Sequence, residues 1–211
     1  MFIKSKKIDH TALDALVNAG VNRHLAKFYS ARGIKHIDDA TLLIEKIIPP
    51  EALTNNTLMA SILADAILQK HKILIIGDYD TDGATSTAVG VRALKMMGAE
   101  VDYLVPNRFE FGYGLTPEIV DLAKEKNPKI IITVDNGIAS VEGVNQANQY
   151  GIDVLVTDHH LPGETLPHAK CIVNPNQHGC SFPSKYLCGV GVIFYVMLAL
   201  RAELRKRDYF K

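Results

Sequence analysis

Three aspartates occupy alternate positions in the segment Gly77-Asp78-Tyr79-Asp80-Thr81-Asp82-Gly83. Carboxylates packed this closely repel one another, and they stay ionised only where a cation or several hydrogen bonds compensate the charge. Further along the chain, Asp135 and the triplet Asp158-His159-His160 also follow apolar runs. Oxygen ligands mixed with imidazole suit Mn²⁺ or Mg²⁺ better than a thiolate-rich structural zinc site does. The sequence therefore predicts a site for a pair of divalent cations.

Each of these segments directly follows a run of branched apolar residues, which is typical of a strand buried inside a parallel sheet. Strands and helices alternate from Lys72 onward, which predicts an α/β fold with a parallel, Rossmann-like sheet of about five strands flanked by helices. Loops that follow parallel strands gather at the carboxyl edge of the sheet, so we expect the acidic and imidazole groups to meet there. The expected strands are 73–76, 101–105, 129–134, 152–157 and 171–173, and the expected helices are 84–97, 116–126, 141–150 and 189–204.

The domain prediction divides the chain into a helical N-terminal segment, residues 1–70, and the α/β domain, residues 71–211. Apolar residues at helical spacing predict two helices in the first 33 residues. A third apolar stripe over 37–48 ends at a pair of prolines, and a last helix is expected over 57–69.

Composition limits the classes of function. Hydrophobic residues make up 47% of the 211 residues, enough for a sizeable core, and 23 basic residues balance 23 acidic ones. A polyanionic partner must therefore be held by a local patch or by metal ions. The three cysteines show no zinc-ribbon spacing and indicate a reducing, cytoplasmic setting. No apolar run is typical of a signal peptide or a membrane span.

Other interpretations of the same motifs fit less well. The aspartate-rich loop begins like an EF-hand, but Val89 stands where the bidentate glutamate belongs. A haloacid-dehalogenase-type phosphatase would use an aspartate as nucleophile; it leaves Asp158-His159-His160 unexplained and stays open as an alternative. The glycine patterns 112–114 and 189–191 are incomplete as nucleotide-binding loops.

Taken together, the motifs resemble those of the DHH phosphoesterase superfamily and, within it, the RecJ-type single-stranded-DNA-specific 5′-to-3′ exonucleases. The resemblance covers nearly the whole chain. The matching segments are 77–86, 105–109, 112–115, 134–138, 157–163, 174–176, 182–185 and 189–192.

The resemblance implies roles for individual residues. Asp80, Asp82, Asp135 and His159 would coordinate two Mn²⁺ or Mg²⁺ ions, with Asp135 bridging them, and Asp78 would be a further ligand or an orienting partner. The remaining implied roles are substrate-phosphate contact for His160, orientation of an imidazole for Asp158, a grip on a phosphate for Arg108, and phosphate or DNA contacts for Asn136 and Gly137.

The resemblance also implies hydrolysis of phosphodiester bonds in single-stranded DNA by a two-metal-activated water, in DNA repair and recombination. A single-strand-binding protein and a helicase would be partners. RecJ-like proteins continue past the last apolar helix to another metal-ligand aspartate and further domains, so we expect this chain to be a truncated form. Two alternatives stay open: a DHH-type phosphodiesterase or pyrophosphatase acting on oligonucleotides, cyclic dinucleotides or pyrophosphate, and a catalytically silent metal-binding fragment.

Overall fold

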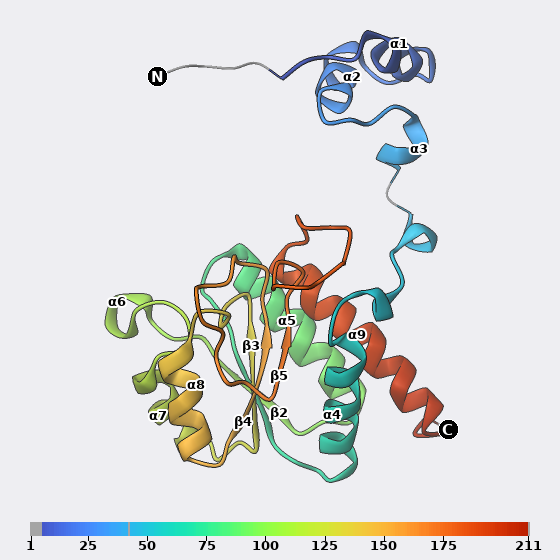
Figure 1. Ribbon diagram of the computed structural model, residues 1–211. Coiled ribbons are helices and arrows are strands. Elements are labelled where there is room, and N and C mark those ends of the chain that lie inside the picture. Colours follow the sequence, from blue (N-terminus) through green and yellow to red (C-terminus); the bar gives the residue numbers. More distant parts are fainter. Residues whose placement is uncertain (1–5, 42, 211) are drawn as a thin grey trace. The chain divides into compact units, whose positions relative to one another are not determined.

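The computed structural model describes residues 6–41 and 43–210 (Figure 1). The chain forms two compact units, Met1–Ile48 and Pro49–Lys211, and each is described here by itself. The first unit contains α1 (His10–Asn18), α2 (Arg23–Ser30), α3 (Ile37–Ala40) and the 3₁₀ turn η1 (Ile44–Lys46). Asp9 caps α1, and a small core forms between α1 and α2 around Leu13, Leu16 and Ala26. The two helices expected in the first 33 residues are therefore confirmed.

The helix expected over 37–48 is wrong in the part of that range that the structure describes, which excludes residue 42. Only α3 and η1 form there. Thr41 has an extended backbone, and its hydroxyl donates a hydrogen bond to the carbonyl of Ile37 at 2.9 Å. Ile37, Leu43 and Ile44 are exposed. A short helix is unstable without a packed apolar face, and exposure of these three described residues leaves the stripe without that support.

The second unit is built on a five-stranded parallel sheet with the strand order β2-β1-β3-β4-β5 (Figure 1). The central strands β1 and β3 are fully buried, as their unbroken apolar runs predict. The parallel sheet and its five strands confirm the expected fold class. The strands are β1 (Ile73–Ile76), β2 (Val101–Leu104), β3 (Ile130–Val134), β4 (Asp153–Thr157) and β5 (Cys171–Val173).

Helices cover both faces of this sheet, with α4, α5 and α9 on one side and α7 and α8 on the other (Figure 1). The side chains of α7 and α8 share a core with alternate residues of the strands, among them Leu74 and Ile131. The helices of this unit are α4 (Asn56–Leu68), α5 (Thr81–Met96), α6 (Arg108–Phe111), α7 (Pro117–Glu125), α8 (Val141–Gln149) and α9 (Gly189–Lys206), with the 3₁₀ turn η2 (Pro50–Ala52) before them.

Helix α5 differs from its prediction in start and orientation. It begins at Thr81, three residues earlier than expected, because the Asp80 side chain caps it. Of the apolar residues expected to face the core, Leu94 and Met97 are buried near the end of the helix, whereas Ala84 and Ala88 are exposed. The earlier turns bury small residues instead, and a Cβ on Gly90 would lie 2.8 Å from the Ile75 side chain. Small side chains therefore let α5 approach the sheet more closely than a leucine-rich face would.

The boundary of the compact units lies ahead of the domain boundary expected near residue 70. Helix α4 packs on α9 within the second unit. Arg207 at the end of α9 forms an ion pair with Asp65 and donates a hydrogen bond to the Ser61 hydroxyl at 2.8 Å, and both partners lie on α4. The packing between α4 and α9 explains why the second unit begins at Pro49.

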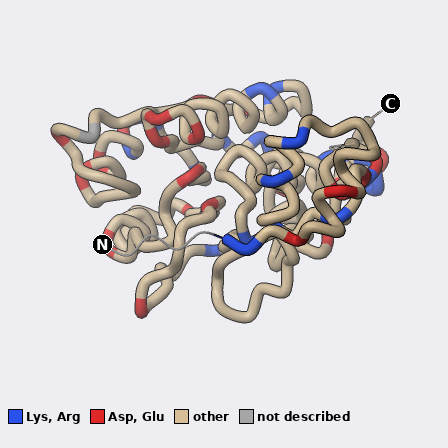
Figure 2. Tube along the Cα trace, turned by 90° about the horizontal axis from the view of Figure 1, so that it is seen from above, with Lys and Arg blue, Asp and Glu red and all other residues tan. Residues whose placement is uncertain are grey.

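Charged residues of both signs are scattered along the trace between long uncharged stretches (Figure 2). The zero formal net charge therefore does not come from one acidic half and one basic half of the chain. Among the described residues, no helix has the length and apolarity that crossing a membrane requires.

Candidate metal centre

The order of the strands places one crevice at the carboxyl edge of the sheet. The chain runs outward from β1 to β2, then returns past β1 to β3, so the direction of winding reverses between β1 and β3. Ligands of open α/β sheets bind outside the carboxyl ends of the strands at such a reversal. Asp78 leaves the sheet just beyond β1, and Asp135 leaves it directly after β3. Val134 lies opposite Thr157, so Asp158 leaves β4 level with Asp135.

Two of the aspartates belong to the start of α5. The Asp80 carboxylate accepts a hydrogen bond from the Gly83 backbone N–H at 2.9 Å and thereby forms the N-cap. A Cβ on Gly83 would lie 2.5–2.7 Å from backbone atoms of Asp78. Only glycine fits there, and its absence of a side chain brings the first turn of α5 against the end of β1. Asp78 and Asp80 are thereby held close together.

Asp82 has a structural role that its position in the sequence does not reveal. Its carboxylate accepts hydrogen bonds from the backbone N–H groups of Gly189 and Val190, both at 2.7 Å. These are the first residues of α9, so Asp82 caps a helix more than a hundred positions away. One Asp82 oxygen also lies 3.6 Å from Nε2 of His159. The glycine pattern at 189–191 is therefore the start of α9, and its first N–H groups bind the Asp82 carboxylate of the same chain.

Asp135 is the most constrained residue of the crevice. It has a left-handed backbone, with φ of 61°, and its side chain is only 2% exposed. Its Oδ1 atom lies 3.0 Å from Nε2 of His159 but accepts no hydrogen bond from any residue that the structure describes. Burial raises the pKa of Asp135 to about 7, and the neighbouring charges of Asp82 and Asp80 act in the same direction. A bound cation would offset both the cost of burying the ionised carboxylate and its repulsion by the neighbouring aspartates.

Asp158 orients the second histidine. It is buried, and its carboxylate accepts hydrogen bonds from the backbone N–H groups of Ile138, His159 and His160 and lies 2.7 Å from Nδ1 of His160. Burial raises the pKa of Asp158, but the hydrogen bonds outweigh it, so the net pKa is lowered. The hydrogen bond to Asp158 raises the pKa of His160. The buried Asp158 carboxylate therefore favours its ionised form, and the more exposed His160 imidazole favours its protonated form.

Two asparagines after β5 hold the backbone of both histidines, and the sequence prediction gave them no role. Asn174 Nδ2 donates to the carbonyl of His160 at 2.9 Å, and Asn176 Nδ2 donates to the carbonyl of His159 at 2.6 Å. The Asn174 side chain also accepts a hydrogen bond from the Asn176 N–H, which fixes the turn between them. A polar pair directly after a strand of the same sheet was the available signal.

Ligand atoms come together in two groups among the described residues. Asp78, Asp80 and Asp135 form one group, and Asp135, His159 and His160 form the other. Within each group the ligand atoms lie within 4.8 Å of one another, and Asp135 belongs to both. Carboxylates with imidazole, a buried oxygen without a donor and a shared aspartate fit a pair of Mn²⁺ or Mg²⁺ ions.

The other residues named from the sequence lie around these groups. Asn136 is buried, and its amide donates to the carbonyls of Ile76 at 3.2 Å and Val134 at 2.9 Å, so it joins the ends of β1 and β3. Gly137 has φ of 109° and lines a neighbouring cavity. Arg108 begins α6, but its side chain lies outside the described part of the chain.

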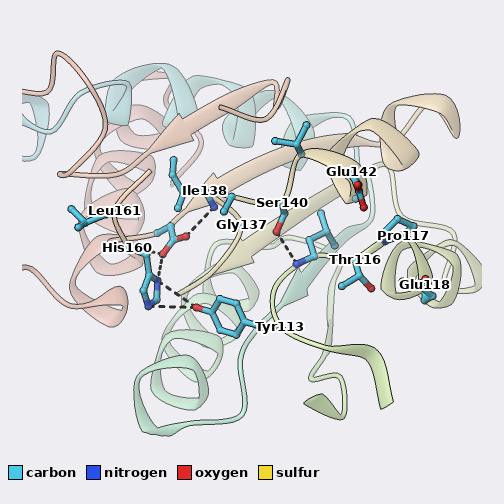
Figure 3. Close-up of a pocket in the computed structure, with 15 residues that line it drawn as sticks. Tyr113, Thr116, Pro117, Glu118, Gly137, Ile138, Ser140, Glu142, His160 and Leu161 are labelled. Carbon is cyan, nitrogen blue, oxygen red and sulfur yellow. Dashed lines mark hydrogen bonds and ion pairs between the residues drawn. The ribbon is translucent and has the colours of Figure 1, made fainter. Parts of the chain in front are cut away.

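The cavity beside His160 has a volume of about 550 Å³ and lies between the starts of α7 and α8 (Figure 3). Ser140, which precedes α8, accepts a hydrogen bond from the Leu115 N–H at 3.0 Å and so joins the two helix starts. Tyr113 stands at the same end as His160, and its hydroxyl lies 3.4 Å from the imidazole nitrogens. The cavity therefore adjoins the second ligand group.

Fold and site together define an α/β protein with a candidate two-metal centre at the carboxyl edge of a parallel sheet. The chain belongs to the DHH family: the family model for its N-terminal domain matches residues 72–210.

Within the DHH family, the chain is similar to RecJ proteins. The chain is 46% identical over 209 residues to the single-stranded-DNA-specific exonuclease RecJ of Escherichia coli (strain K12), a match that covers 99% of this chain and 36% of that protein. The chain thus spans about a third of the length of this relative. The resemblance to RecJ-type proteins is confirmed.

Solved structures of RecJ proteins are also similar to this chain. A crystal structure of exonuclease RecJ bound to manganese is similar at 37% identity with a TM-score of 0.67, over 72% of this chain and 38% of that one. RecJ from Thermus thermophilus in complex with Mn²⁺ is similar at 30% identity with a TM-score of 0.72, over 93% of this chain and 28% of that one.

Proposed function

We propose that this chain is the metal-dependent core of a phosphodiesterase, an exonuclease that degrades single-stranded DNA from 5′ to 3′. One observation carries the proposal: Asp135 belongs to both ligand groups, and its buried Oδ1, which lies 3.0 Å from Nε2 of His159, accepts no hydrogen bond from the described residues. A buried carboxylate oxygen without a donor is costly, and a bound cation is the natural compensation. The similarity to RecJ proteins supports the choice of substrate.

In this proposal Asp78, Asp80 and Asp135 would hold one ion, and Asp135 and His159 would hold the second. Asp82 completes the site from the side of α9. When bound, Mn²⁺ or Mg²⁺ ions polarise a water molecule and neutralise charge on the phosphate. Asp135 has to be held rigidly for this task, and the Asn136 amide does so by joining the strand ends on either side of the crevice.

His160 acts on the substrate side of the centre. Its hydrogen bond to Asp158 orients the imidazole and raises its pKa, which favours the protonated ring that donates to a phosphate oxygen as negative charge develops there. Asn174 and Asn176 hold the backbone of the two histidines and act as positioning residues. Arg108, at the start of α6 beyond β2, is proposed to add a charge-assisted hydrogen bond to a phosphate.

The wider biological assignment rests on the family resemblance. We propose a role in DNA repair and recombination in the cytoplasm, with a single-strand-binding protein and a helicase as partners. The balanced charge of the chain favours a substrate held by metal ions over one held by a broad basic surface.

The experiment is a titration of Mn²⁺ into this chain, with bound ions and hydrolysis of a 3′-labelled single-stranded oligonucleotide both measured. We expect two ions per chain and shortening from the 5′ end, with a dinucleotide and a duplex cleaved more slowly. Asp135→Asn should abolish both binding and hydrolysis, and Glu164→Gln, an exposed carboxylate of the same unit, should change neither. Binding without turnover would favour the silent metal-binding fragment, and preference for the dinucleotide would favour the oligonucleotide phosphodiesterase. Absence of Mn²⁺ binding would refute the metal centre.

A further inference from the structure

The cavity between α7 and α8 shares two residues, Asp158 and His160, with the surroundings of the candidate metal centre. His160 forms one end of the cavity, and Pro117 and Glu118 of α7 lie towards the other (Figure 3). A molecule whose phosphate contacts His160 would therefore extend its next chemical group into this space. The question is which group the walls accept.

The walls disfavour a second phosphate. Among the described side chains that line the cavity there is no lysine or arginine, whereas Glu118 and Glu142 lie in the first turns of α7 and α8. Apolar side chains supply much of the remaining surface, and a neutral group with flat apolar faces suits such walls. The apolar lining residues are Leu115, Pro117, Ile138, Ala139, Val141 and Leu161.

The polar groups of the cavity offer little discrimination between ligands. The Ser140 hydroxyl accepts the Leu115 N–H at 3.0 Å, and the Thr116 hydroxyl accepts the Ile119 N–H at 3.4 Å. The Thr116 hydroxyl also forms a hydrogen bond with the Glu118 carboxylate, so Ser140 supplies the O–H that can donate to a ligand. All four DNA bases carry acceptor atoms that satisfy such a donor. Tyr113 adds an aromatic ring at the end next to His160, and bases of any sequence stack on aromatic rings.

We propose that this cavity is a nucleoside subsite, which takes the sugar and base of the nucleotide whose phosphate lies at the metal centre and accepts any of the four bases. The proposal rests on the proposed function, because it needs a phosphate beside His160. The cavity volume of about 550 Å³ lies within the ~300–1,000 Å³ typical of small-molecule sites.

The test compares three ligands on the Mn²⁺-saturated chain by calorimetric titration: inorganic phosphate, deoxyribose 5-phosphate and thymidine 5′-monophosphate. We expect the nucleotide to bind about tenfold more tightly than the sugar phosphate, since base stacking and apolar contact are present only with the base. The other three deoxynucleoside monophosphates should bind within about threefold of thymidine 5′-monophosphate. Equal affinity for sugar phosphate and nucleotide would overturn the subsite.

Variants locate the effect. Ala139 is exposed and lines the cavity, so Ala139→Phe fills it without disturbing the core. This change should remove the tenfold advantage of the nucleotide and leave the affinities for phosphate and Mn²⁺ unchanged. Leu161→Ser, at a side chain that is 79% exposed, should reduce the same advantage. Ala202→Phe, at an exposed position on α9, is the matched control and should preserve it.

The outcomes separate the two proposals. Retention of the full nucleotide advantage in both cavity variants would overturn the subsite and leave the metal centre standing. Failure of the wild-type chain to bind phosphate at saturating Mn²⁺ would overturn the proposed function, and the subsite with it.

Discussion

Replacing Asp135 by asparagine should stabilise the metal-free protein and abolish its stabilisation by Mn²⁺. The substitution removes a buried negative charge and keeps the shape of the side chain. Asparagine also tolerates the left-handed backbone that this position requires, with φ of 61°. An alanine would add backbone strain to the loss of the carboxylate, so asparagine isolates the effect of the charge.

The magnitude follows from proton linkage. The pKa of Asp135 is raised from 3.8 to about 7, mainly by burial and then by Asp82 and Asp80. Because the folded pKa lies above the unfolded one, ionised Asp135 destabilises the folded state, and this penalty grows as the pH rises from about 4 to about 7. At ~1.36 kcal/mol per pH unit, the full penalty is about 4 kcal/mol above pH 7. A domain of this size shifts its Tm by roughly 2–4 °C for each kcal/mol.

The assay is thermal unfolding of wild type and Asp135→Asn in a chelator, at pH 8 and at pH 4. We expect the variant to unfold several degrees higher at pH 8 and the two proteins to converge at pH 4, where the wild-type carboxyl group is protonated in the fold. Excess Mn²⁺ at pH 8 should raise the Tm of the wild type far more than that of the variant. Glu164→Gln serves as the control for removal of an exposed charge. The reasoning fails if the chelated variant is no more stable at pH 8, or if Mn²⁺ raises both Tm values equally.

Two further substitutions probe the groups that hold the site. Asn176→Ala removes the 2.6 Å hydrogen bond to the His159 carbonyl, and we expect Mn²⁺ affinity to fall about tenfold, as for other outer partners of metal ligands; an unchanged affinity in a calorimetric titration would exclude a positioning role. Gly189→Ala places a methyl group against the Asp135 carboxylate and should cost about 1–3 kcal/mol in chemical unfolding as well as weakening Mn²⁺ binding. Gly163→Ala, where the nearest atom lies 3.8 Å away, should have little effect, and equal losses in the two glycine variants would contradict the crowding argument.

The sequence predicts the parallel sheet because its strands are short, continuous apolar runs, which are typical of strands buried on both faces. Each run directly precedes its functional segment, so the meeting of Asp78, Asp135 and Asp158 at one edge follows from the rule that parallel strands share a carboxyl edge. The sequence also predicts a helix start where an N-cap residue is followed by proline, as at Thr116-Pro117.

Local patterns failed where packing decides. The first turns of α5 bury glycine, serine and threonine, which no hydrophobic periodicity detects, and only the last buried position, Leu94, belongs to the apolar pattern. The apolar stripe over 37–48 suggested a helix, but Ile37, Leu43 and Ile44, which belong to the described part of this range, are exposed. In both cases the outcome depends on how closely another element approaches, which spacing along the chain does not encode.

The sequence by itself determined which chemical groups the protein carries and that they leave parallel strands at the same edge. Only the tertiary structure decided how they divide the work. It assigned Asp82 to the start of α9 and placed Asn174 and Asn176 against the backbone of the two histidines. These pairings depend on strand order and on the path of the chain between distant segments, and both are fixed when the whole sheet and its helices pack together.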